Sequence, residues 1–229
     1  MNSIKKKSTC LLLMILSCLI AKGEPRNLLA NGNFDGDPPL KGWLISFPDE
    51  AFYKDNGSYV KIAPAGDVGR RRAVMLDLPP GIAGNQGGKI ESLPMPVVAG
   101  ATYRVEVDCM TWDFSAKIHA EAWSTDPNPE QKRTIFRRAA ADGRPAMIMC
   151  FRAQVPSPPA GSKSWTTAAR DFKVPEKVIV AGKEQKPEFI SVKVVSYAAT
   201  MDAGKSYFSN FRLYRIEQKV AEQKSDSKP

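Results

Sequence analysis

Short runs of β-branched and aromatic residues, separated by prolines and glycines, limit what this chain can fold into more than any other feature. Eighteen prolines and sixteen glycines punctuate the 229 residues. A proline inside a helix removes a backbone hydrogen bond and clashes with the preceding turn, so long helices are disfavoured. Runs of this kind predict strands, and strands this numerous predict two packed antiparallel sheets. We therefore predict an all-β fold, a two-sheet antiparallel β-sandwich of the jelly-roll type.

The predicted strands are bounded by turn residues and follow one another along most of the chain. They are Asn27–Phe34, Trp43–Phe47, Ser58–Ala63, Ala73–Leu78, Gly88–Leu93, Thr102–Trp112, Lys117–Trp123, Ala146–Val155, Ala168–Val174, Phe189–Ala198 and Ser206–Ile216. Between residues 126 and 165 the pattern loosens. We predict there a loop excursion from the sandwich, with a short helix around Gln131–Ala141 and one extra strand.

Alternation between apolar and polar residues is clearest in TYRVEVDCMTW and in KIHAEAW, which follows it. Side chains two residues apart share a face of a strand, so one set points inward. The inward set is Tyr103, Val105, Val107, Cys109, Ile118, Ala120 and Ala122. The outward set is Arg104, Glu106, Asp108, Met110, Trp112, Lys117, His119, Glu121 and Trp123. A short turn at Phe114 and Ser115 predicts that the two strands are neighbours in one sheet.

The outward set suits a sugar ligand. Sugar rings present flat C–H faces that stack on indole, and their hydroxyls pair with carboxylates and guanidinium groups. We predict a carbohydrate-binding face on which Tyr197, from the polar side of its own strand, joins the other residues. Its members are Trp112, Trp123, Arg104, Glu106, His119, Glu121 and Tyr197. The alternative is that the excursion covers the two tryptophans as a second, small core.

Catalytic signatures are incomplete. Glu106 and Asp108 match the start of the Glu-x-Asp-x-x-Glu motif of laminarinase-type glycoside hydrolases, but Thr111 and Trp112 stand where its second glutamate would be. Without that residue, half of the carboxylate pair needed for glycosidic hydrolysis is lost. There is no Gly-x-Ser-x-Gly elbow, and a single histidine gives little scope for a triad. We predict that the protein is not an enzyme.

The cysteines after the N-terminal segment are Cys109 and Cys150. Together with His119 they cannot build a zinc-type metal cluster. The alternation along its strand places the Cys109 side chain inward. In AMIMCFRAQV the inward set is Met147, Met149, Phe151 and Ala153, which leaves Cys150 outward. A disulfide between the two cysteines therefore needs a bulge or a strand switch, and two buried free thiols are the alternative.

The first 23 residues have the three parts of a secretory signal peptide. Lys5, Lys6 and Lys7 precede an apolar run from Cys10 to Ala21, and Ala21-Lys22-Gly23 supplies small residues for cleavage. The run is short for a membrane span, although a membrane anchor and a lipoprotein at Cys18 remain open. We predict an exported protein (periplasmic, extracellular or at the cell surface), with a sandwich domain over 24–217 and a disordered charged tail over 218–229.

The chain is moderately basic. The whole chain has 33 lysines and arginines against 24 acidic residues, a formal net charge of +9. Loss of the four lysines of the signal segment reduces this charge to +5. Apart from arginine runs near 70–72 and 133–144 the positive charges are scattered. The sequence therefore carries no nucleic-acid footprint, while a preference for anionic surfaces is compatible with it.

The opening stretch NLLANGNFDGDPPLKGW, residues 27–43, resembles the first strand and Gly-Trp of the galactose-binding-like jelly rolls, especially the CenC-type carbohydrate-binding modules. VVAGATYRVEVDC, SWTTAARDFKVPE and SYFSNFRLYRIE are similar, in that order, to later strands of the same modules. The resemblance covers nearly all of residues 27–217. It implies that Leu28, Leu29 and Phe34 anchor the first strand in the core, with a turn at 31–33.

The resemblance also implies a structural calcium between the opening loop and an aspartate of the closing strand. Asp35 fits the first position, whereas Asn210 stands at the second. The loss of one carboxylate lowers the charge of the site and its expected affinity for calcium.

Three functions follow as hypotheses. The first is a secreted, non-catalytic glycan-binding module that binds a poly- or oligosaccharide as a monomer, with no nucleic-acid partner and no membrane span after processing. The second is an exported structural or adhesion protein that uses the same fold without a sugar ligand. The third is a small glycan-active hydrolase or lyase with an unrecognised motif.

Overall fold

The computed structural model describes residues 25–45, 59–69, 72–80, 87–128, 137–138, 143–196 and 203–216. The predicted signal segment, the charged tail and the predicted site residue Tyr197 lie outside the described residues. Within those ranges, no helix has the length and apolarity needed to cross a bilayer.

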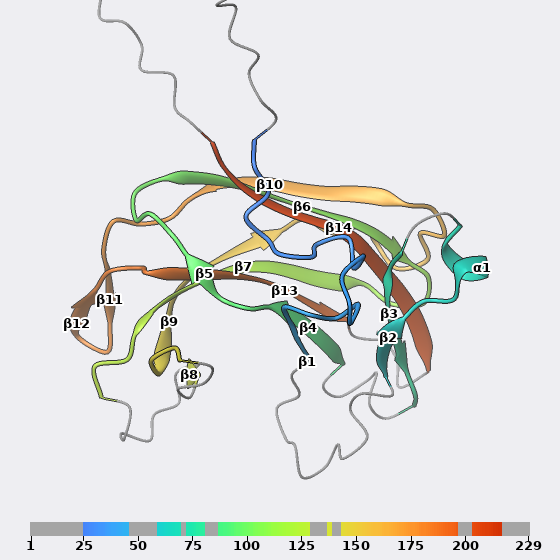
Figure 1. The fold of residues 1–229 in the computed structure, drawn as a ribbon, viewed down its shortest axis with the longest axis horizontal. Helices are drawn as coiled ribbons and strands as arrows, with labels where there is room; N and C mark the ends of the chain where they lie inside the picture. The colour runs from blue at the N-terminus through green and yellow to red at the C-terminus, as the bar shows by residue number, and fades with distance from the viewer. Residues whose placement is uncertain are drawn as a thin grey trace, which may run out of the picture.

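Two antiparallel sheets form the body of the molecule (Figure 1). Sheet A has seven strands, in the order β1 (Trp43–Ile45), β4 (Gly88–Ser92), β13 (Phe189–Ser196), β7 (Ala116–Thr125), β9 (Met147–Val155) and β8 (Arg137–Arg138), with β5 (Met95–Pro96) paired to β13. Sheet B has five strands, in the order β10 (Thr166–Lys173), β6 (Thr102–Thr111), β14 (Gly204–Ile216), β3 (Val74–Leu78) and β2 (Val60–Ile62). A small hairpin, β11 (Val178–Val180) with β12 (Lys183–Gln185), and the four-residue helix α1 (Ala65–Val68) lie at opposite ends. The predicted all-β sandwich is confirmed.

Ten of the eleven predicted strands are present, with ends shifted by a few residues at most. The strands β5, β8, β11 and β12 were not predicted, because two or three residues are too few to show a period of two. The predicted helix at 131–141 lies outside the described residues except for Arg137–Arg138, which form β8. The excursion does contribute β9 to sheet A, as predicted.

The opening segment is not a strand, so the prediction for Asn27–Phe34 is wrong. The side chain of Asn27 replaces strand pairing, because its oxygen accepts from Leu213 N (2.9 Å) and its nitrogen donates to Phe211 O (3.0 Å). Leu29 and Phe34 are buried as predicted, but Leu28 is 38% exposed. The turn at 31–33 is present, and the described chain begins and ends side by side (Figure 1).

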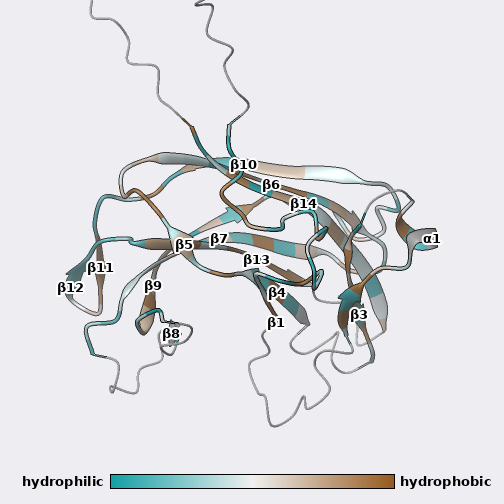
Figure 2. Ribbon diagram, in the orientation of Figure 1, coloured by the Kyte–Doolittle hydropathy of each residue, from teal (hydrophilic) through white to brown (hydrophobic). Residues whose placement is uncertain are grey.

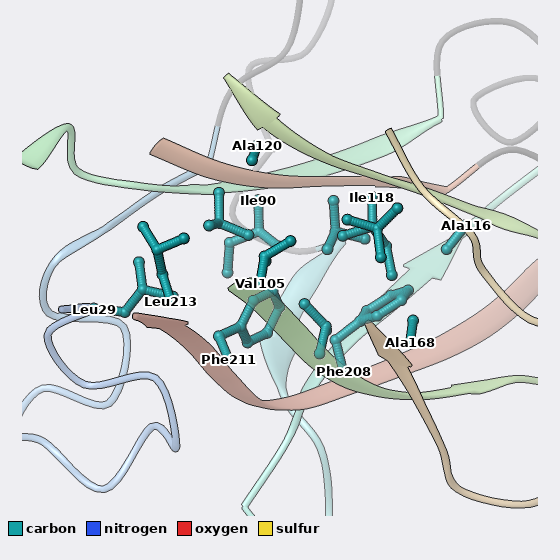
Figure 3. Packing of buried hydrophobic residues seen from close by; sticks show 14 of the residues in the cluster. Leu29, Ile90, Val105, Ala116, Ile118, Ala120, Ala168, Phe208, Phe211 and Leu213 are labelled. Atoms are coloured by element: carbon teal, nitrogen blue, oxygen red, sulfur yellow. The ribbon is translucent and has the colours of Figure 1, made fainter. Parts of the chain in front are cut away.

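The core lies between the two sheets (Figure 3). Ile90 and Ile118 of sheet A face Val105, Phe208 and Phe211 of sheet B. Every predicted inward residue of β6 and β7 belongs to this cluster. Figure 2 shows polar and apolar residues interspersed along the strands, as expected where one face of each strand is buried.

The strands β6 and β7 belong to different sheets, which overturns the prediction that they are neighbours. β6 pairs with β10 and β14, whereas β7 pairs with β13 and β9. The short connection is therefore a corner between sheets rather than a hairpin. Phe114 is fully buried at this corner and packs with Leu78, and Asp113 N donates to Lys205 O (3.3 Å). As a consequence, the outward residues of β6 and β7 lie on opposite faces of the sandwich.

A bulge in β9 corrects the predicted parity of that strand. Trp123 pairs with Met149 and Ala122 with Phe151, so the register shifts at Cys150. Met149 consequently lies on the outer face, whereas Cys150 packs against the core. Cys109 and Cys150 are both free thiols. Desolvation raises their pKa values to about 12 and about 11, which makes them poor nucleophiles.

Candidate functional site on the outer face of sheet A

Polar side chains from four adjacent strands lie in two rows across the outer face of sheet A. The pairing register aligns Glu91 of β4, Lys193 of β13, His119 of β7 and Gln154 of β9 in the first row. The second row is Ser191, Glu121 and Arg152. Charged residues are seldom buried unless they are paired, so their gathering on the middle strands of a sheet requires explanation.

Glu121 lies at the centre of the face and is completely buried. One of its oxygens accepts from Arg152 Nη2 at 2.8 Å, and both oxygens lie 3.2 Å from Lys193 Nζ. Glu121 and most of Lys193 left water to form this cluster, and the desolvation penalty of buried ion pairs commonly offsets their attraction. The triad is therefore poor evidence for a purely stabilising role, but it holds two cations at fixed positions.

A closed ring of contacts joins Trp123, Ser191, Glu91 and Arg138. The indole Nε1 of Trp123 donates to Ser191 Oγ at 2.9 Å, and Ser191 Oγ donates to Glu91 Oε1 at 2.6 Å. Glu91 forms an ion pair with Arg138. The guanidinium carbon of Arg138 lies 4.4 Å from the ring centroid of Trp123, within cation–π range, and closes the ring. Trp123 is only 3% exposed.

The position of Arg138 shows that sheet A curls over its own outer face. β8 lies at one edge, separated from β4 by β9, β7 and β13. In a flat sheet, four strand spacings of about 4.8 Å would separate β8 from β4 by about 19 Å, beyond the reach of one arginine. Arg138 nevertheless contacts Glu91 of β4 and Trp123 of β7. The outer face is therefore concave around Trp123.

Burial perturbs the titratable groups of this face. His119 is 8% exposed, and its Nδ1 is buried with no hydrogen-bond partner in the described part of the chain. Desolvation, followed by the nearby Arg152, lowers the pKa of His119 to about 4, so the ring is neutral at pH 7. Desolvation raises the pKa of Glu91 against the opposing effect of Arg138, and lowers the pKa of Lys89.

The predicted site residues are divided between the two outer faces. His119, Glu121 and Trp123 lie together on sheet A, whereas Arg104, Glu106 and Trp112 lie on sheet B. The sequence prediction missed Glu91, Ser191, Lys193, Arg152 and Arg138. Parity marks Glu91, Ser191 and Lys193 as outward residues of their strands. What parity does not provide is the order of strands that brings them beside Glu121.

The predicted residues on sheet B form a separate ion-pair network. Arg104 Nε contacts Glu106 Oε1 at 2.7 Å, and Arg104 Nη1 contacts Asp171 Oδ1 at 2.9 Å. Arg212 Nε contacts Glu106 Oε2 at 2.9 Å. The network is partly exposed and links three adjacent strands, which fits a solvated sheet surface.

Trp112 packs near the end of the same face. Its ring meets Tyr207 edge-on, with centroids 5.9 Å apart, beside a small buried cluster that includes Met75 and Met110. Trp112 is half-buried and packs against this cluster. The helix α1 supplies part of the cover through Val68.

The residues named for calcium do not fit that ion. The side chain of Asp35 is 65% exposed and lies 3.9 Å from the guanidinium of Arg72. Arg72 also donates to the carbonyl oxygen of Phe34 at 3.4 Å, so the chain places a cation of its own beside these oxygens. Asn210 instead donates to Asp108 Oδ2 at 2.9 Å on the outer face of sheet B. The two side chains therefore have different partners.

No protein-family model matches this sequence, and no curated protein matches it significantly. Solved structures resemble the fold. The tailspike protein 4 of bacteriophage CBA120 matches with a TM-score of 0.46 at 12% identity over 83% of this chain, which spans about a fifth (21%) of that one. The CBM22-2 xylan-binding domain of Paenibacillus barcinonensis Xyn10C matches with a TM-score of 0.45 at 10% identity, over 79% of this chain and 95% of that one. TmCBM61, solved in complex with β-1,4-galactotriose, matches with a TM-score of 0.40 at 16% identity, over 83% of this chain and 99% of that one.

Several of the similar structures are thus carbohydrate-binding modules with a β-sandwich fold. None of them singles out the CenC type. With identities of 10–16% and TM-scores of 0.40–0.46, these likenesses carry no conclusion about this chain.

Proposed function

We propose that this protein is a non-catalytic glycan-binding module and that its ligand lies across the concave outer face of sheet A. The observation that carries the proposal is the buried cluster in which Glu91 and Glu121 hold Arg138, Arg152 and Lys193 around Trp123. Guanidinium groups offer planar sets of donors that match adjacent sugar hydroxyls, and such groups bind best when their positions are fixed beforehand. A sheet face with charged groups fixed in this way suits a polar ligand better than a hydrophobic partner.

The proposal divides the cluster into contact groups and positioning groups. Arg152 and Gln154 of β9 and Lys117 of β7 are exposed and would meet the ligand, together with the outer edge of Arg138. Glu121 is buried beneath them and acts by orienting Arg152. Trp123 supports Arg138 instead of stacking on a sugar, which differs from the role predicted from the sequence.

We propose a non-catalytic module because the carboxylates of Glu91 and Glu121 are both held in ion pairs. A retaining or inverting glycosidase needs one carboxyl group at the leaving oxygen and another near the anomeric carbon or its water. Glu121 is fully buried against two cations, and Glu91 pairs with Arg138 and Ser191. Either side chain would have to break those contacts before it could reach the glycosidic bond of a bound sugar.

A second candidate is an exported structural or adhesion protein with no sugar ligand. The observation in its favour is that both tryptophans are engaged in packing, since Trp123 is buried beneath Arg138 and the half-buried Trp112 packs against the small cluster on the opposite sheet. In this case the charged cluster only sets the curvature of sheet A.

Affinity electrophoresis in gels that contain neutral and acidic polysaccharides separates the two candidates. We expect retardation of the wild-type protein by at least one glycan. The variant Arg138→Ala should weaken that binding at least tenfold. Arg104→Ala is the matched control, because Arg104 also pairs with a glutamate but lies on sheet B. Migration unchanged by every glycan, or equal effects of both substitutions in variants with native circular dichroism, would favour the structural candidate.

Export belongs to the same proposal. We propose that the chain is processed near Gly23 and works outside the cytoplasm as a monomer. Mass spectrometry of the protein recovered from cells expressing the full chain tests the processing, because cleavage there would remove the first 23 residues. An intact N-terminus would contradict it.

A further inference from the structure

The outer face of sheet A has an excess of positive charge. Among the described residues, its cations are Lys89, Lys117, Arg138, Arg152 and Lys193. Its carboxylates are Glu91 and Glu121. Five positive and two negative charges leave three positive charges on one concave surface.

These cations are close enough to influence one another. After desolvation, the largest influence that lowers the pKa of Lys89 is the charge of Lys193. Desolvation and then Arg152 lower the pKa of His119, and Lys193 and Lys117 lower it further. Glu121 opposes these cations at His119, and burial rather than charge is the largest cause of the shift. The part that comes from Arg152, Lys193 and Lys117 is a positive potential, and a positive potential attracts an anion.

The face also shows which anion its cations fit. Glu121 sits on Arg152 and Lys193, and Glu91 sits on Arg138, so each of these cations already has a carboxylate within contact distance. Arginine pairs with carboxylates through parallel N–H donors. A second carboxylate approaching from solvent would meet the exposed side of Arg152 and Lys117.

We infer that the ligand of this face is an acidic glycan whose sugars carry carboxylates, that is, a polysaccharide of uronic acids. This inference rests on the proposed glycan-binding function and adds the chemical class of the ligand. The formal net charge, +9 for the whole chain and +5 without the four lysines of the signal segment, has the sign that attracts such a polymer.

The test compares polymers that differ only in the carboxyl group. Polygalacturonate and alginate are each compared with their carboxyl-reduced forms, in which CH₂OH replaces the carboxylate. Dextran sulfate serves as a general polyanion. Isothermal titration calorimetry measures each Kd at two salt concentrations. We expect at least one uronate polymer to bind at least tenfold more tightly than its reduced form and than dextran sulfate, and to weaken as salt increases.

Two charge-matched variants locate the interaction. Arg152→Gln removes a cation of the concave face, whereas Arg215→Gln removes an exposed cation near the end of β14 in sheet B. We expect the first to weaken uronate binding at least tenfold and the second by less than twofold. Urea unfolding of both variants shows whether Arg152→Gln has kept its fold. Lys117→Gln, at an exposed position of the same face, provides a second substitution should that variant unfold.

Each other outcome overturns the inference in a distinguishable way. Equal binding of the uronate and its reduced form would refute the acidic ligand and leave the glycan-binding function intact. Binding of dextran sulfate as tight as that of the uronates, or equal losses in Arg152→Gln and Arg215→Gln, would reveal non-specific attraction. No binding to any polymer would remove the proposed function and the inference together.

Discussion

Acidification should destabilise this protein through His119. The folded environment lowers the pKa of this side chain from 6.5 to about 4, first because of desolvation and then because of Arg152. Between these two values the unfolded chain binds a proton that the folded chain does not. Stability therefore rises with pH in this window, and the stability present above pH 6.5 is lost progressively as the pH falls toward 4.

The magnitude follows from the two pKa values. Each tenfold difference in proton affinity corresponds to about 1.4 kcal/mol, so the full effect is about 3 kcal/mol. Between pH 7 and pH 5 the unfolded histidine becomes almost fully protonated while the folded one stays neutral. The expected loss in this interval is about 2 kcal/mol. His119 is 8% exposed, so solvent screening reduces the effect little.

Urea unfolding followed by far-UV circular dichroism at pH 7 and pH 5 measures the effect. Other groups titrate too, and Glu91 acts in the opposite direction because its raised pKa favours proton uptake by the folded state. The comparison is therefore between the wild type and His119→Gln, which keeps a polar side chain that cannot titrate. The wild type should lose about 2 kcal/mol more than the variant between the two pH values. The same loss in both proteins would refute the reasoning.

Four further outcomes follow from the structure. Glu121→Gln leaves the largely buried Lys193 and the partly exposed Arg152 without their carboxylate and should lower the free energy of unfolding by about 3 to 5 kcal/mol; a loss below 1 kcal/mol in urea unfolding would contradict this. Phe211→Ala should cost about 3 to 5 kcal/mol, because it opens a cavity in the core between the sheets. Gly32→Ala should cost about 1 to 3 kcal/mol, since a Cβ there would lie 2.1 Å from the backbone oxygen of Phe211. Because Cys109 and Cys150 are free, a reducing agent should leave the thermal midpoint unchanged, and a lowered midpoint would indicate a disulfide between them.

The carbohydrate-binding face predicted from the sequence shows how far a parity argument extends. Alternation correctly identified which residues of β6 and β7 point into the core. It also identified His119, Glu121 and Trp123 as members of one outer face. Trp112, Arg104 and Glu106 were assigned to the same face only because the two strands follow each other along the chain. Their connection crosses between the sheets, so that assignment is wrong.

The bulge in β9 and the side-chain pairing of Asn27 mark another limit. Both replace regular strand pairing by contacts with residues distant in sequence, with Trp123 in the first case and Leu213 in the second. A bulge inserts one residue into the period of two, and no local pattern announces it. The sequence therefore predicted Met149 inward and Cys150 outward, and the structure has them reversed.

The sequence by itself determined the all-β class, nearly all of the longer strands and the membership of the core, because local alternation and turn residues encode burial directly. Tertiary structure alone decided which strands are neighbours, and so which charges meet. Glu121, Arg138 and Arg152 come from the consecutive strands β7, β8 and β9, whereas Glu91 comes from the earlier strand β4, and the order of sheet A brings the four side chains together. Polar residues on an outer face follow no local rule that names their partners. Their energies depend on burial and on distances that exist only once the sheet has formed and curled.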